Sequence, residues 1–84
     1  MKHLFLIHEY DYDDKENSVI GVADSLENVE LMINEYYGNF REISFTDIRD
    51  CNIEYSKVIE LIDLDRYSTY KLKITIENII LNEI

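Results

Sequence analysis

One stretch of the sequence, DSLENVELMINEYYG at residues 24–38, decides the fold. Apolar side chains recur in it at the three- and four-residue spacing that places them on one arc of an α-helix. The apolar arc consists of Leu26, Val29, Met32, Ile33, Tyr36 and Tyr37. The polar arc consists of Glu27, Glu30, Asn34 and Glu35. The pattern predicts one amphipathic helix that ends near Tyr37.

The residues that flank this stretch predict both helix ends. Asp24 and Ser25 offer an N-cap, and Asp24 followed three residues later by Glu27 fits a capping box that begins with aspartate. Gly38 stands where a left-handed residue closes a helix, a backbone conformation that glycine adopts without steric cost.

The residues before the helix predict a β-hairpin. Residues 2–10 are apolar and aromatic on both alternating faces, which is typical of a strand inside a sheet. Residues 11–17 are polar and predict a turn, and residues 18–23 predict a second strand. We therefore expect a hairpin with a long acidic tip.

The second half of the chain gives weaker signals. Residues 40–45 predict a short strand, and residues 46–50 fit either one helical turn or a loop. Residues 53–64 have some apolar positions at helical spacing, but their β-branched content favours a strand over a helix. Residues 69–77 alternate between apolar and polar side chains, as a half-buried strand does. After Glu77 the alternation shifts by one residue, which predicts either a bulge near Asn78 or burial on both faces.

These elements predict an α+β fold of a single domain, residues 1–84. The expected architecture is a small antiparallel sheet with one main helix packed on one face, in the order ββαβββ, with the second half less sharply defined. One helix covers only one face of such a sheet. The other face must therefore be polar or meet a partner.

Charge excludes one large class of function. The chain has 18 acidic and 8 basic side chains and a net charge of −10. Such a chain repels phosphate backbones, so we expect no direct binding to nucleic acid. A basic protein surface is the partner that this charge attracts. The alternative explanation of the charge is solubility alone.

The sequence predicts a cytoplasmic protein of a bacterial cell. No apolar run approaches the length of about 18 residues that crosses a membrane, and the N-terminus does not have the pattern of a signal peptide. The single cysteine, Cys51, forms no disulfide within the chain, which fits a reducing compartment. The abundance of Ile, Asn and Tyr, with no Pro, fits the AT-rich coding of a low-GC bacterium or its phage.

No residue pattern predicts an enzyme, a cofactor or a metal site. His3 and His8 are five residues apart on a predicted strand, so they face opposite sides and cannot share a metal. A calcium loop that begins at Asp11 would need glycine where Glu16 stands and an acid where Val22 stands. Glycine-rich phosphate loops and nucleophile–base patterns are absent from the sequence.

Acidic residues gather in the first half of the chain, and they define the candidate site. Residues 1–40 hold nine acidic and two basic side chains, whereas residues 41–84 hold nine and six. Tyrosine is favoured at interfaces because it offers a large contact area and a hydroxyl at low entropic cost. The expected charged contacts are Asp11, Asp13, Asp14, Glu16, Glu27, Glu30 and Glu35. The expected desolvated contacts are Tyr10, Tyr12 and Leu31.

Residues 3–40 also carry a resemblance. A strand and an acidic hairpin lead to the run Ile20-Gly21-Val22, a turn with Ser25 and Glu27, and a helix that ends near Gly38-Asn39-Phe40. This order resembles the start of small bacterial and phage domains of unknown function. The helix positions that are usually small in those domains hold Val29 and Met32 here. The resemblance implies an α+β fold and no activity.

Two hypotheses of function follow. The first is a small acidic inhibitor that binds a basic protein, such as a nuclease or another nucleic-acid-handling protein, and mimics the charge of nucleic acid. Phage anti-defence proteins of the anti-CRISPR type and immunity proteins against nuclease toxins are of this general size and charge. The second is a homodimeric structural or adaptor module without catalytic activity, whose C-terminal segment Tyr70–Ile84 offers a free edge or a second apolar face.

Overall fold

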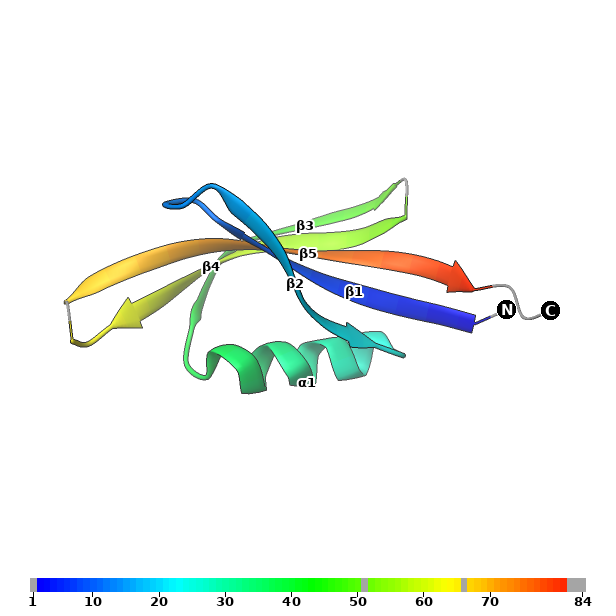
Figure 1. Cartoon of the computed structure of the whole chain (residues 1–84), viewed down its shortest axis with the longest axis horizontal. Coiled ribbons are helices and arrows are strands. Elements are labelled where there is room, and N and C mark those ends of the chain that lie inside the picture. Colours follow the sequence, from blue (N-terminus) through cyan, green and yellow to red (C-terminus); the bar gives the residue numbers. More distant parts are fainter. Residues whose placement is uncertain (1, 51, 66, 82–84) are drawn as a thin grey trace.

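A computed structural model of the chain describes residues 2–50, 52–65 and 67–81 (Figure 1). Its elements are β1 (Lys2–Asp11), β2 (Glu16–Ala23), α1 (Leu26–Tyr37), β3 (Arg41–Asp50), β4 (Ile53–Asp63) and β5 (Ser68–Leu81). The strands form one five-stranded sheet whose neighbouring strands are all antiparallel. The predicted α+β class and the predicted succession of elements are confirmed.

The order of strands across the sheet is β2-β1-β5-β4-β3. β1 is an interior strand, as its two apolar faces predicted. β5 is the middle strand and pairs with β1 on one side and β4 on the other. The C-terminal strand therefore offers no free edge, and that ground for the homodimer hypothesis is wrong. The free edges belong to β2 and β3.

The helix has the predicted length and the predicted C-terminal glycine. Gly38 has a φ of +67°, and its N–H donates to the carbonyl of Asn34 at 3.0 Å. The N-cap is Ser25, whose hydroxyl accepts from the backbone N–H of Asn28 at 3.1 Å. The predicted capping box from Asp24 to Glu27 is wrong, because Asp24 binds the side-chain amide of Asn28 at 2.7 Å instead.

The core lies between α1 and the middle of the sheet (Figure 1). Val29 and Ile33 of the helix are fully buried, as are Ile59 of β4 and Ile74 of β5. The buried helix arc is narrower than predicted. Leu26 and Tyr36 belong to the first and last turns and are 40% and 61% exposed.

The second half of the chain is more regular than the sequence predicted. β3 continues through residues 46–50, so neither a helical turn nor a loop forms there, because Thr46 and Asp47 pair with Ser56 and Tyr55 of β4. β4 is a strand, as its β-branched content indicated.

The predicted bulge near Asn78 is wrong. β5 pairs with β1 without any shift of register, and the irregularity lies in β4 between Ile53 and Tyr55. The backbone N–H of Asn78 donates to the carbonyl of Asn52 at 2.6 Å. Asn78 and Ile79 are half-buried, so this end of β5 is partly covered on both faces.

The face of the sheet opposite α1 carries a mixture of apolar and charged side chains. Leu4 pairs with Ile79, and Tyr10 pairs with Lys73, across the β1–β5 ladder. These residues alternate with the buried positions of the same strands, which places them on the uncovered face.

In the described ranges, no helix is long and apolar enough to cross a membrane.

The core predicts a contrast between two isoleucines of β4. Replacing Ile59, which is fully buried, by valine should lower the free energy of unfolding by about 1 kcal/mol, because a buried methylene is lost. Replacing Ile62, which is 67% exposed, by valine should change it by less than about 0.5 kcal/mol. Urea denaturation of both variants measures the difference. Equal losses in the two variants would place the core elsewhere.

Candidate functional site

The tip of the β1–β2 hairpin is a short and well-fixed turn. The Asp11 carboxylate accepts from the backbone N–H groups of Asp13 and Asp14 at 2.9 and 3.3 Å. The N–H of Lys15 donates to the carbonyl of Asp11 at 2.7 Å. The turn is shorter than the predicted 11–17, because the two strands pair as far as Asp11 and Glu16. Asp11 therefore holds the turn together through its own side chain.

Three carboxylates project from this tip. The side chains of Asp13, Asp14 and Glu16 are exposed, and no described residue bonds to their carboxylates. Beside them the rings of Tyr10 and Tyr12 meet edge to face, with centroids 5.2 Å apart. The tip thus presents unpaired negative charge next to an aromatic pair.

Glu30 has a structural role that the helix pattern did not reveal. Its carboxylate accepts from the Tyr55 hydroxyl and lies 3.1 Å from the Lys57 ammonium. Lys57 is only 5% exposed, and Glu42 lies 3.7 Å from it on the other side. The carboxylate of Glu30, whose side chain is 46% exposed, therefore has a structural partner that the polar arc did not indicate, since it is a counter-ion of a buried lysine.

Two tyrosines at the border of the core hold their protons tightly. Burial, followed by the hydrogen bond to Glu30, raises the pKa of Tyr55 far above its usual value. Burial and the 2.7 Å hydrogen bond that Tyr37 donates to Glu9 raise the pKa of Tyr37 in the same way. Both hydroxyls act as donors that tie the helix side of the molecule to the sheet.

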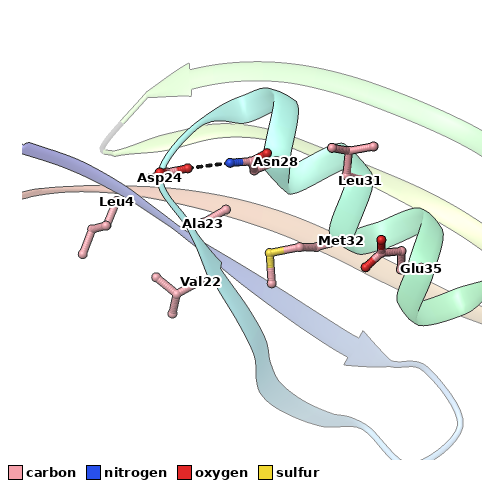
Figure 2. Close-up of a pocket in the computed structure, with 8 residues that line it drawn as sticks. All are labelled: Leu4, Val22, Ala23, Asp24, Asn28, Leu31, Met32 and Glu35. Atoms are coloured by element: carbon pink, nitrogen blue, oxygen red, sulfur yellow. Dashed lines mark hydrogen bonds between the residues drawn. The ribbon is translucent and has the colours of Figure 1, made fainter.

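The remaining predicted residues lie on the outer side of the helix. Glu27, Leu31 and Glu35 are exposed, and Leu31 is 58% exposed despite its size. Figure 2 shows Leu31 and Glu35 at the border of an open groove between α1 and β2. The groove reaches round the edge strand and is lined by Leu4, Val22, Ala23, Asp24, Asn28, Leu31, Met32 and Glu35, of which Leu4 and Val22 point to the face of the sheet away from α1.

The structure divides the predicted site into two surfaces. Figure 1 shows the turn between β1 and β2 on the side of the sheet away from α1. The tip residues therefore do not form one continuous acidic surface with those of the helix. The sequence also missed the groove, because nothing in a helix pattern shows which side of the helix lies beside the edge strand β2.

The two histidines are engaged separately. His3 Nδ1 lies 3.2 Å from the side-chain oxygen of Asn78, and His8 Nε2 lies 2.9 Å from a carboxylate oxygen of Glu77. In the part of the chain that the structure describes, no group of three or more His, Cys, Asp or Glu is placed to hold a metal. Cys51 lies outside the described residues.

A scan of protein-family models, a search of curated proteins and a search of solved structures found no match to this chain. The resemblance of residues 3–40 to small bacterial and phage domains therefore stays a prediction. The site must be interpreted from its own geometry.

The raised pKa values of the two tyrosines predict a loss of stability at high pH. Above about pH 10, an unfolded tyrosine releases its proton while Tyr37 and Tyr55 keep theirs, so alkali favours the unfolded chain. The double variant Tyr37→Phe with Tyr55→Phe should lose less stability between pH 9 and about pH 11 than the wild type. Urea midpoints across this range measure the effect.

A matched control is Tyr67→Phe, because Tyr67 is 93% exposed. That variant should follow the pH dependence of the wild type. A double variant whose midpoints fall as steeply as those of the wild type would contradict the assignment of the two buried hydroxyls.

Proposed function

We propose that this chain is a small acidic inhibitor that binds a basic surface of a nucleic-acid-handling protein. The observation that carries the proposal is the hairpin tip, where Asp13, Asp14 and Glu16 are exposed and bonded to no described side chain. Charges of this kind attract a basic surface over a long range and set the rate of association. Such a protein acts without catalysis, by occupying the surface that nucleic acid would bind.

The rigidity of the tip supports this proposal. The side chain and the carbonyl of Asp11 hold the backbone of the turn at three N–H groups, so the backbone that carries Asp13 and Asp14 is fixed. A pre-organised surface loses less conformational entropy on binding than a mobile loop. The edge-to-face pair of Tyr10 and Tyr12 adds a contact that can be desolvated beside the charges.

We assign the steering role to the tip more than to the helix. Glu30 pairs with Lys57, and α1, which carries Glu27 and Glu35, lies on the other side of the sheet from the hairpin turn (Figure 1). A partner with one flat basic face would meet either the tip or the helix. We further propose that the chain works in the cytoplasm of a bacterial cell, in a phage anti-defence or toxin-immunity role.

A homodimeric module is the second candidate function, and the edge strand β3 favours it. Ile43, Phe45 and Ile48 of this strand are all exposed. Two register shifts, between Glu42 and Ser44 and between Asp47 and Asp50, interrupt its ladder with β4. Bulges of this kind discourage edge-to-edge pairing, so β3 supports a dimer less strongly than the tip supports an inhibitor.

The test of the inhibitor proposal is binding to a panel of purified nucleic-acid-binding proteins with basic grooves. We expect a one-to-one complex with at least one member, weakened as salt rises and displaced by duplex DNA. The double variant Asp13→Lys with Asp14→Lys should lower the affinity about tenfold or more. Calorimetry measures affinity and stoichiometry, and light scattering gives the mass of the free chain.

The matched control carries the same change of charge elsewhere. Glu27→Lys with Asp47→Lys alters exposed residues of α1 and β3 and should weaken binding much less. Equal losses in the two double variants would show that net charge alone is responsible. Equal binding to cytochrome c, a basic protein that handles no nucleic acid, would also overturn the proposal. A dimeric free chain that binds no member of the panel would favour the second candidate.

A further inference from the structure

The groove between α1 and β2 is lined by apolar side chains, and one of them, Leu31, takes no part in the core. Leu31 of α1 is 58% exposed, although it is a large apolar side chain, whereas Val22 of β2, which is 49% exposed, points to the face of the sheet away from α1. Met32 reaches from the helix towards the side of β2 that faces α1 (Figure 2). Ala23 completes the floor and is itself buried. The groove has a volume of about 470 Å³ and is open along its length.

The border of the groove is negatively charged. Asp24 stands at one end, where it accepts from the side-chain amide of Asn28, and Glu35 stands one helical turn beyond Leu31. Of the described residues that line the groove, two carry carboxylates and none carries a basic side chain. No described residue bonds to the carboxylate of Glu35. The occupant that this lining fits has apolar side chains flanked by positive charges.

The floor can adapt its shape. A Cβ atom on Gly21 would lie 2.6 Å from the terminal methyl of Met32, so the absence of a side chain at Gly21 lets Met32 lie against β2. Methionine has an unbranched and polarisable side chain that adjusts to irregular surfaces. A groove with a methionine in its floor accepts apolar side chains of differing shape.

We propose that the α1–β2 groove binds an extended segment of a protein in which apolar residues alternate with lysine or arginine. One apolar side chain of that segment packs against Leu31 and Met32, and a neighbouring basic side chain pairs with Glu35. This inference rests on the proposed function in one respect, since it names a second contact with the same basic partner. The tip attracts the partner, and the groove recognises a short segment of it.

The test uses synthetic peptides and the two-dimensional amide spectrum of the labelled chain. The probe is the peptide KLKVKLK, and the controls are KSKTKSK, which keeps only the charge, and ELEVELE, which keeps only the apolar residues. In about 150 mM salt, where long-range attraction is screened, KLKVKLK should shift the amide signals of Ala23, Leu31 and Met32 in a saturable manner. KSKTKSK and ELEVELE should shift them weakly and without saturation.

Two leucine variants locate the contact. Leu31→Ser should lower the affinity for KLKVKLK about tenfold, because one leucine contact with the peptide is lost. Leu64→Ser is the matched control, since Leu64 is 77% exposed and outside the groove, and it should leave the affinity unchanged. Both leucines are exposed, so both variants should fold. Glu35→Gln should weaken KLKVKLK and leave ELEVELE unaffected.

The outcomes separate this inference from the inhibitor proposal. The groove is refuted if KSKTKSK or ELEVELE saturates the same signals with equal affinity, or if Leu31→Ser binds KLKVKLK as the wild type does. Binding of a panel protein that Asp13→Lys with Asp14→Lys abolishes and Leu31→Ser leaves intact would uphold the inhibitor and refute the groove. Peptide binding in the groove without any binding to the panel would uphold the groove and refute the inhibitor proposal.

Discussion

A single helix has to bury one face of a five-stranded sheet, and most features of this molecule follow from that constraint. A helix of 12 residues is about 18 Å long, whereas the molecule measures 51 Å along its longest axis. Only the middle of the sheet lies against α1, so only there are side chains fully buried. Val29 and Ile33 supply the helix side of this small core, and the strand ends extend beyond it.

Polar contacts close the border where the helix no longer covers the sheet. Tyr37 donates to Glu9 on one side, and Lys57 with Tyr55 meets Glu30 on the other. A lysine that is 5% exposed would be costly without counter-ions, since a buried charge needs a partner. The network therefore ties α1 to β4 at a place where apolar side chains alone would leave a gap. Removing Glu30 would leave Lys57 with Glu42 alone, 3.7 Å away.

The sequence predicted the parts of the fold whose patterns are local. The helix has apolar residues at three- and four-residue spacing, and the strand after residue 68 alternates apolar and polar residues. Both elements are confirmed. Residues 46–50 were mispredicted because they belong to an edge strand whose residues 41–49 are exposed on both faces, where burial leaves no pattern. The bulge was predicted in β5, but the irregular pairing lies in β4. The sequence shows that the apolar alternation shifts near Asn78, but it does not show which strand carries the extra residue.

The candidate site depends even more on contacts between residues that are far apart in the sequence. A helix wheel places Glu30 and Glu35 on one polar arc, but it contains no information about Lys57, which lies on a strand more than twenty residues later. Lys57 occupies the carboxylate of Glu30, and the backbone of the turn similarly occupies that of Asp11. The acidic residues therefore divide by what surrounds them and not by where they stand in the sequence.

That division has a consequence for how a partner would be bound. Exposed charge at the tip acts over a distance and weakens with salt, whereas an apolar contact at Leu31 acts only on touching and is insensitive to salt. A small acidic domain that used charge alone would bind many basic surfaces equally. A second contact of a different physical kind, on the other side of the sheet, limits binding to partners that offer both. The long sheet makes this arrangement available, because one helix leaves both the tip and the groove uncovered.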